Sequence, residues 1–223
     1  MKAFERMGRE LPYIMVYPDD YRPELQYPLV VMLHGYGADM RDLASLSPAI
    51  DPQGYIYACP NAPLPVEIGP NMYGFSWTPP REEATEEDIA KAEKTLDDFF
   101  MEVMIEHRAP MGKAALLGFS QGGSMAYRRG LKMPQMFSGL VALSTWLPDD
   151  AQEGLPEERS IPIFIGHGTH DRVDISRARD AHRFLTQAGY KAEFHEYPMG
   201  HEINQQEIND MIPWLHRVLP PVG

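Results

Sequence analysis

The sequence has one cysteine, few basic side chains and no long apolar run, and each shortage excludes a class of protein. With Cys59 alone among 223 residues, neither an internal disulfide nor a multi-cysteine zinc site can form. The 32 acidic and 20 basic side chains give a formal net charge of -12, which repels nucleic acid and anionic lipid. We therefore expect no nucleic-acid partner.

Membrane insertion is also not expected. No stretch approaches the roughly 20 apolar residues that span a bilayer, and the opening MKAFERMGRE has no apolar core of a signal peptide. These shortages predict a cytoplasmic protein. We expect a monomer or a homodimer. The rest of the composition, 43% hydrophobic and 23% charged, is ordinary for a globular protein, and we expect one domain over residues 1–223.

Apolar runs of strand length alternate with longer amphipathic stretches. A helix is expected from Thr85, whose pairing with Asp88 suggests a capping box, to the residues before Pro110. Two more helices are expected over 174–188 and roughly 204–219. The alternation predicts an α/β fold: a mostly parallel central sheet of about seven strands, helices on both faces and no cap domain. The expected strands are 14–17, 28–33, 55–60, 114–119, 139–144, 161–166 and 191–197.

The segment GFSQGG confines a serine between glycines directly after an apolar strand. Gly-x-Ser-x-Gly on a strand-to-helix turn is the nucleophile elbow: Gly118 and Gly122 leave room for a tight turn, and Ser120 projects above the strand end. The following helix would begin beneath the serine and stabilise negative charge there. An ordinary glycine-flanked turn is the alternative interpretation.

A serine hydroxyl needs a base, and the chain order Ser, then Asp or Glu, then His supplies candidates. Asp171 follows the strand IPIFIG, and His201 follows the strand KAEFHEY. Both therefore fall at the same edge of a parallel sheet as Ser120, where ligands bind in open α/β sheets.

Other acidic and histidine side chains have simpler explanations. Asp174 is expected to cap the helix that it precedes, and His195 to pack inside a strand. His167 and His170 precede Asp171 and break the chain order, while His107 and His216 suit helix C-termini. Cys59 ends a strand and is expected to be a buried structural thiol.

Acyl transfer from a serine also needs two donors aimed at the oxyanion. The backbone N–H of Gln121, directly after Ser120, is one candidate. The segment LHGYG at 33–37 follows an early strand, and its glycines allow the N–H of Tyr36 to turn toward the serine. An ordinary glycine turn is the alternative for this segment.

Five segments, LHGYGAD, GFSQGGSMA, LSTWLP, HGTHDRVD and YPMGHEI, together resemble the carboxylesterase, lysophospholipase and acyl-protein thioesterase family of α/β-hydrolases. The similarity runs from about residue 11 to 219. The resemblance implies an α/β-hydrolase fold and cleavage of esters or thioesters through an acyl-enzyme, with no cofactor or metal. It also implies Ser120 as nucleophile, His201 as general base and acid, and Asp171 as the group that orients His201.

We expect a serine carboxylesterase acting on short- to medium-chain esters. An acyl-protein thioesterase or lysophospholipase with the same residues, and a non-catalytic binding protein of this fold, are the alternatives. A peptidase would commonly carry a cap domain, and a dienelactone-type hydrolase would carry cysteine at the elbow.

The irregular stretch 60–82, rich in proline and aromatics, is long enough to be functional. Its apolar side chains and Trp146 either wall the substrate pocket or plug the loop onto the core. The candidate pocket residues are Met72, Tyr73, Phe75, Trp77 and Trp146.

Overall fold

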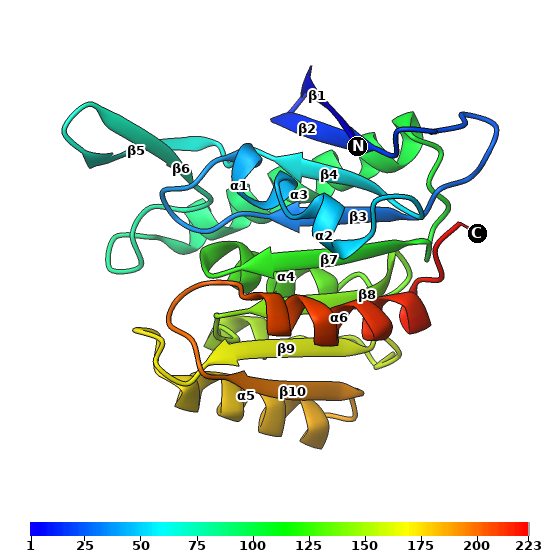
Figure 1. The fold of residues 1–223 in the computed structure, drawn as a ribbon. Helices are drawn as coiled ribbons and strands as arrows, with labels where there is room; N and C mark the ends of the chain where they lie inside the picture. Colours follow the sequence, from blue (N-terminus) through cyan, green and yellow to red (C-terminus); the bar gives the residue numbers. More distant parts are fainter. Residues whose placement is uncertain (223) are drawn as a thin grey trace.

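An eight-stranded sheet runs through the middle of the molecule in the order β1-β2-β4-β3-β7-β8-β9-β10 (Figure 1). The computed structural model describes residues 1–222. All neighbouring strands from β4 to β10 are parallel, whereas β2 runs antiparallel to both β1 and β4. The strands of this sheet are β1 (Lys2–Met7), β2 (Pro12–Tyr17), β3 (Leu29–Leu33), β4 (Ile56–Pro60), β7 (Ala114–Phe119), β8 (Phe137–Leu143), β9 (Ile163–Gly168) and β10 (Ala192–Tyr197).

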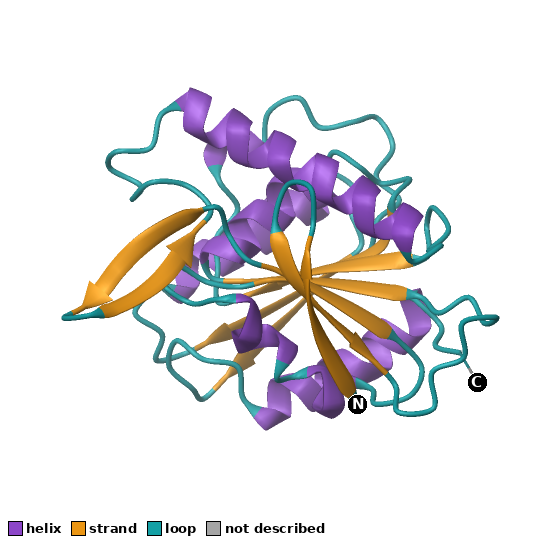
Figure 2. Cartoon of the chain, turned by 90° about the horizontal axis from the view of Figure 1, so that it is seen from above, coloured by secondary structure: helices purple, strands orange, loops and turns teal. Residues whose placement is uncertain are grey.

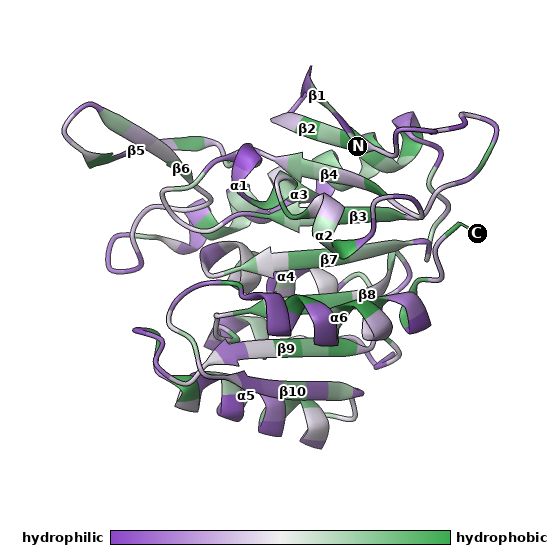
Figure 3. Cartoon of the chain, viewed as in Figure 1, coloured by the Kyte–Doolittle hydropathy of each residue, from purple (hydrophilic) through white to green (hydrophobic). Residues whose placement is uncertain are grey.

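The seven strands expected from apolar runs are confirmed as β2, β3, β4, β7, β8, β9 and β10. The eighth strand, β1, was not predicted because its sequence, KAFERM, contains no apolar run. All six of its residues are exposed in the structure. Figure 3 shows the same contrast: β3, β7 and β8 are apolar in the middle of the sheet, and β1 and β10 are more hydrophilic at its edges.

Helices cover both faces of the sheet (Figures 1 and 2). One face carries α1 (Met40–Ala44), α2 (Ser47–Ile50) and α6 (Gln205–Val218), and the other carries α3 (Glu86–Glu106), α4 (Gln121–Gly130) and α5 (Ile175–Gln187). Alternate side chains of β3 enter opposite cores, since side chains of a strand alternate between faces. Val30 and Met32 belong to the core that includes Trp214 of α6, while Val31 belongs to the core that includes Phe99 of α3.

The expected helices are confirmed, including the start of α3. The Thr85 hydroxyl accepts a hydrogen bond from the Asp88 N–H, and the Asp88 carboxylate accepts one from the Thr85 N–H. Helix α5 agrees with the expected 174–188, and α6 with the expected 204–219.

The expectation of an irregular loop over 60–82 is wrong for about half of its length. Strands β5 (Leu64–Gly69) and β6 (Met72–Ser76) form an antiparallel hairpin that projects past the carboxyl ends of the parallel strands (Figure 1). Its turn places Asn71 at φ 58, a left-handed conformation that asparagine tolerates. The prolines were interpreted as signs of a loop. Pro65 is nevertheless compatible with β5, because it lies at a sheet edge, where no N–H is required.

No cap domain is present in residues 1–222. The chain between β8 and β9 forms only one 3-10 turn, Asp149–Ala151. Within the same residues, no helix has both the length and the apolar composition to cross a membrane. That the whole of 1–223 is one domain stays a prediction.

Candidate active site

The turn between β7 and α4 holds Ser120 in an unusual backbone conformation, with φ 54 and ψ -119. A non-glycine residue with positive φ is strained and must be held by its surroundings. A Cβ at Gly118 would lie 2.2 Å from the Gly122 carbonyl oxygen, and a Cβ at Gly122 would lie 2.1 Å from the Leu33 carbonyl oxygen. Both glycines are therefore required for the turn to close over the end of β3.

Ser120, His201 and Asp171 form one hydrogen-bonded chain, although they lie far apart in the sequence. The Ser120 Oγ is 2.9 Å from the His201 Nε2. The His201 Nδ1 is 2.9 Å from Oδ1 and 3.0 Å from Oδ2 of Asp171. The three side chains follow the carboxyl ends of β7, β9 and β10. They therefore meet at the edge of the sheet that was predicted from the sequence.

Asp171 is held as an ionised acceptor. Its side chain is fully buried, and its Oδ1 accepts a hydrogen bond of 2.8 Å from the Val173 N–H. Burial alone would raise the pKa of Asp171, but hydrogen bonds from Val173 and His201 outweigh that effect and hold the pKa below its usual value. An ionised carboxylate only accepts hydrogen bonds, so the proton of neutral His201 resides on Nδ1 and leaves Nε2 as an acceptor toward Ser120.

Thr145 fixes the serine from the neighbouring strand end, and the sequence did not single it out. Its hydroxyl donates to the Ser120 carbonyl oxygen at 2.7 Å. A Cβ at Gly123 would lie 2.6 Å from the Thr145 Cγ2, so the start of α4 sits directly against this side chain. The only sequence signal was its position in LSTWLP, two residues beyond the end of β8.

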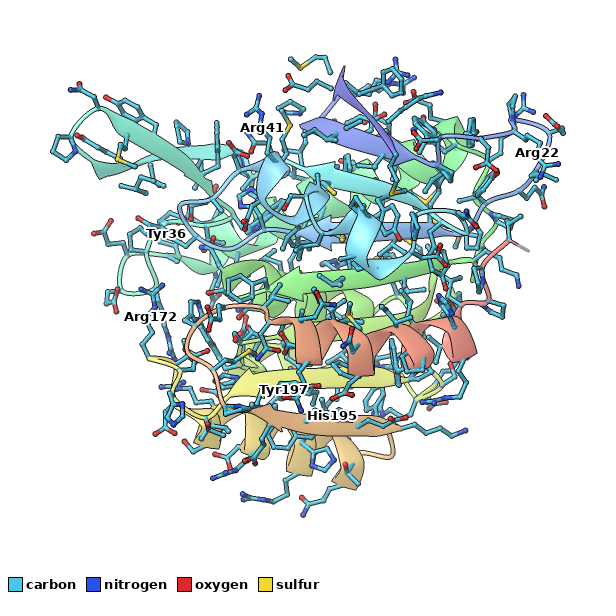
Figure 4. The ribbon with its side chains drawn as sticks, in the orientation of Figure 1. Arg22, Tyr36, Arg41, Arg172, His195 and Tyr197 are labelled. Carbon is cyan, nitrogen blue, oxygen red and sulfur yellow. The ribbon has the colours of Figure 1, made fainter. Side chains whose placement is uncertain are left out.

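Tyr36 and Gln121 line the same cavity as Ser120. No turn or loop hydrogen bond within residues 1–222 uses the backbone N–H of either residue. Gly35, next to Tyr36, is so close that a Cβ there would lie 3.3 Å from the Ser120 Cβ. The Tyr36 side chain is half exposed at the carboxyl edge of the sheet, the edge that also carries Arg172, while Arg22 lies at the opposite end (Figure 4).

His34 is a second residue that the sequence reasoning missed. It is buried, its Nδ1 is 2.8 Å from the Gly35 carbonyl oxygen, and its Nε2 accepts a hydrogen bond of 3.0 Å from the Ala62 N–H. Burial lowers the pKa of this imidazole, which favours its neutral form. His34 therefore fastens the loop that carries Tyr36 to the chain after β4.

A cavity of about 470 Å³ opens beside Ser120 and Gln121, between Tyr36 and Trp146. A larger cavity of about 600 Å³ lies against α3 and contains none of the residues discussed above. The cavity at Ser120 is lined by both apolar and charged side chains. The apolar ones include Pro79, Pro80, Ala84, Ile89 and Met125, and the charged ones are Arg81, Arg128, Asp149 and Asp150.

Of the five residues proposed from the sequence as pocket walls, Trp146 alone lines this cavity. Trp77 is 1% exposed, and its Nε1 donates to the His34 carbonyl oxygen at 2.8 Å. Met72 and Tyr73 are exposed on the hairpin, and Phe75 is partly buried against the core. Their contact with substrate stays a prediction.

The competing side chains take the simpler roles. Asp174 caps α5, its Oδ1 accepting from the Ser176 N–H at 2.8 Å. His195 stacks on Phe164 within the sheet, with 4.7 Å between ring centroids (Figure 4). Cys59 is buried, and burial raises the pKa of its thiol, as expected for a structural cysteine.

A mostly parallel sheet covered on both faces, with a strained serine turn after a central strand, defines the α/β-hydrolase class. The profile of the phospholipase/carboxylesterase family matches residues 22–219. The chain belongs to this family, and it is a hydrolase of the esterase and thioesterase type.

Two individual relatives are named as acyl-protein thioesterases. An acyl-protein thioesterase 1 of Mycosarcoma maydis is 29% identical over 217 residues, covering 84% of this chain and 90% of the relative. An acyl-protein thioesterase 1 of Cryptococcus neoformans is 32% identical over 187 residues, covering 72% and 78%.

Solved structures agree in fold. Esterase PE8 superposes with a TM-score of 0.78 at 26% identity, covering 92% of this chain and 97% of its own. A carboxylesterase from Mesorhizobium loti superposes with a TM-score of 0.80 and covers 96% and 98%, but at 19% identity it supports the fold alone.

Proposed function

We propose that this protein is a serine carboxylesterase that cleaves short- to medium-chain esters through an acyl-enzyme. The observation that carries the proposal is the hydrogen-bonded chain from Ser120 Oγ through both nitrogens of His201 to the buried carboxylate of Asp171. Each member has the chemical state that acyl transfer requires: a hydroxyl, an imidazole with a free acceptor nitrogen, and an ionised carboxylate.

In the proposed reaction, Ser120 Oγ attacks the ester carbonyl carbon while its proton passes to His201 Nε2. The tetrahedral intermediate then expels the alcohol, which takes that proton from His201, and the acyl group remains on Ser120. Water attacks the acyl-enzyme by the same route and releases the acid. Asp171 stays ionised throughout and stabilises the imidazolium form of His201.

The oxyanion would be bound by the N–H groups of Tyr36 and Gln121. Both are free of turn and loop hydrogen bonds in residues 1–222; Gln121 directly follows Ser120, and Tyr36 lines the same cavity. The Gln121 N–H lies in the first turn of α4, where the helix dipole also favours negative charge. Two such donors are the usual number for an acyl-transfer site of this class.

The cavity at Ser120 supports the choice of shorter acyl chains. Its lining combines apolar side chains with a bidentate ion pair between Arg128 and Asp150, which leaves little apolar surface for a long acyl chain. Burying apolar carbon against charged groups removes their water without compensation. A thioester substrate is the second candidate, because the relatives include proteins named acyl-protein thioesterases.

The test is hydrolysis of p-nitrophenyl butyrate and of butyryl thiocholine by the parent protein, by Ser120→Ala and by Ser45→Ala. Ser45 is an exposed serine at the end of α1 and serves as the control. We expect Ser120→Ala to lose at least about a thousandfold in kcat on both substrates, with Ser45→Ala unchanged. The ratio of kcat/KM for the two substrates decides between esterase and thioesterase. Turnover by Ser120→Ala would refute the proposal, because the activity would then arise at another residue.

A further inference from the structure

Strand β6 of the projecting hairpin is joined by its backbone to the loop that carries Tyr36. The Gly37 N–H donates to the Phe75 carbonyl oxygen at 2.9 Å, and the Phe75 N–H donates to the Ala38 carbonyl oxygen at 2.9 Å. Ala38 and Phe75 thus form an antiparallel bridge outside the main sheet. Gly37, the residue directly after Tyr36, is therefore hydrogen-bonded to the hairpin.

Gly74 brings the two backbones closer than any other residue would allow. A Cβ at Gly74 would lie 1.9 Å from the Gly37 carbonyl oxygen and 2.4 Å from the Gly37 carbonyl carbon. Gly74 is buried and does not have a positive φ, so the lack of a side chain is required by space and not by backbone conformation. From the other strand of the hairpin, Ile68 covers the opposite side: its Cγ2 would lie 2.8 Å from a Cβ at Gly37.

The residues that follow β6 hold the side chain of Gln121. The Gln121 Oε1 accepts a hydrogen bond of 3.0 Å from the Trp77 N–H, and its Nε2 donates to the Thr78 Oγ1 at 3.2 Å. The hydroxyl of Ser76, at the end of β6, lies within 3.1 Å of both polar atoms of this amide. The amide is thus committed to the backbone and hydroxyls of 76–78, away from the reacting atoms.

One short segment therefore contacts both parts of the chain that carry the candidate oxyanion donors: Gly74 and Phe75 contact the Tyr36 loop, and residues 76–78 bind the side chain of Gln121. We propose that residues 74–78 are a clamp that sets the spacing of the Tyr36 and Gln121 N–H groups, with Gly74 and the Gln121 side chain as its positioning residues. The inference rests on the proposed function, since it presupposes an oxyanion at Ser120.

Such a clamp matters because donors to an oxyanion act only at hydrogen-bond distance from its final position. A displacement of about 1 Å is enough to lose most of the effect of one donor, and losing one donor costs about 100- to 1000-fold in kcat. Substrate binding in the ground state does not depend on these donors to the same extent, so the loss should appear in kcat and not in KM.

The experiment compares Gly74→Ala with Gly69→Ala in the same hairpin. A Cβ at Gly69 meets nothing closer than the Met72 Sδ at 3.7 Å, so this substitution adds the same methyl group without a clash. A third variant, Gln121→Met, keeps the length of the side chain and removes its hydrogen bonds to 76–78. The readouts are kcat and KM for p-nitrophenyl butyrate per active site titrated with a fluorophosphonate, and the Ki of a trifluoromethyl ketone that forms a tetrahedral adduct.

We expect Gly74→Ala and Gln121→Met each to lower kcat by about tenfold to a hundredfold with KM changed less than about threefold, and to raise the Ki by a matching factor. Gly69→Ala should behave as the parent. Equal kcat per active site in all three variants and the parent would overturn the clamp while leaving the proposed function intact, as would a rise in KM alone. Should Gly74→Ala fail to fold, Gln121→Met decides by the same criteria. Turnover surviving Ser120→Ala would overturn the proposed function and the clamp with it.

Discussion

Glu207 is a buried acid directly behind the candidate active site. It lies in the first turn of α6, its side chain is fully buried, and neither carboxyl oxygen has a hydrogen-bond partner within residues 1–222. A Cβ at Gly166 would lie 2.0 Å from the Glu207 Oε1, so the carboxyl group rests on the bare backbone of β9. Burial, together with the charge of Asp171, raises the pKa of Glu207 to about 8.

This raised pKa predicts a specific effect of pH on stability. The unfolded chain releases the Glu207 proton near its ordinary pKa of 4.5, whereas the folded protein keeps it up to about pH 8. Between these values the unfolded state binds fewer protons, so the free energy of unfolding falls as pH rises. Glu207→Gln removes this dependence and keeps the shape of the side chain.

We expect Glu207→Gln to gain stability over the parent by roughly 3 kcal/mol more at pH 8.5 than at pH 5.5. Urea unfolding of both proteins at the two pH values measures this difference. A stability difference between parent and variant that is the same at both pH values would mean that Glu207 is already ionised in the folded protein.

At this scale the sequence predicted that Ser120, Asp171 and His201 meet, but it did not predict the residues that support them. Ser120, Asp171 and His201 could be found because chain order and strand ends constrain them. The sequence could not identify Thr145, His34 and Glu207, because their roles depend on contacts between segments far apart in the sequence. No local pattern distinguishes them from ordinary loop and helix residues.

Helix α4, which begins at the candidate nucleophile, is tied to α3 by a partly buried ion pair. The Arg129 Nε and Nη2 donate to the two oxygens of Asp97 at 2.7 Å and 2.6 Å, and its Nη1 donates to Glu93 at 3.2 Å. The arginine side chain is 11% exposed, so its charge needs these partners.

We expect Arg129→Met to lower the free energy of unfolding by about 2 kcal/mol, because Asp97 loses its cation and Glu93 keeps only Arg128, at 3.7 Å. The kcat per folded molecule should stay within about twofold, since Ser120 is anchored from the other side by Gly118, Gly122 and Thr145. Chemical denaturation and p-nitrophenyl butyrate turnover measure the two quantities. A large loss of kcat without a loss of stability would show that α3 helps to place the serine.

Among elements, continuous apolar runs and the capping box were sufficient to predict the parallel strands and the long helices. The hairpin β5–β6 was not predicted because its strands bury only Gly74 and Ser76 and because its prolines are typical of loops. Its two strands are recognisable only from their pairing with each other and from the Ala38–Phe75 bridge.

At the scale of the whole molecule, the site lies open at the carboxyl edge of the sheet. Only one 3-10 turn lies between β8 and β9 in the described chain, and the cavity of about 470 Å³ is lined partly by apolar and partly by charged side chains. Each methylene that packs on the apolar side chains contributes about 0.8 kcal/mol, and further methylenes contribute little. The net charge of -12 also opposes approach to anionic membrane surfaces.

We therefore expect kcat/KM for p-nitrophenyl esters to rise with acyl length and to peak at about four to eight carbons. No jump in rate should occur as the substrate passes its solubility limit. A series from acetate to palmitate tests both expectations. A maximum at palmitate, or strong activation above the solubility limit, would require a longer channel than the cavity at Ser120.

The most direct measurement is the site of covalent modification by a fluorophosphonate. Reaction requires a serine activated by a neighbouring base, so mass spectrometry of the digested protein should find one adduct, on the peptide that contains Ser120. The rate of labelling should fall by orders of magnitude in His201→Ala, which removes the partner 2.9 Å from the Ser120 Oγ. An adduct on another residue, or labelling that is undiminished in Ser120→Ala, would contradict the assignment of Ser120 as the nucleophile.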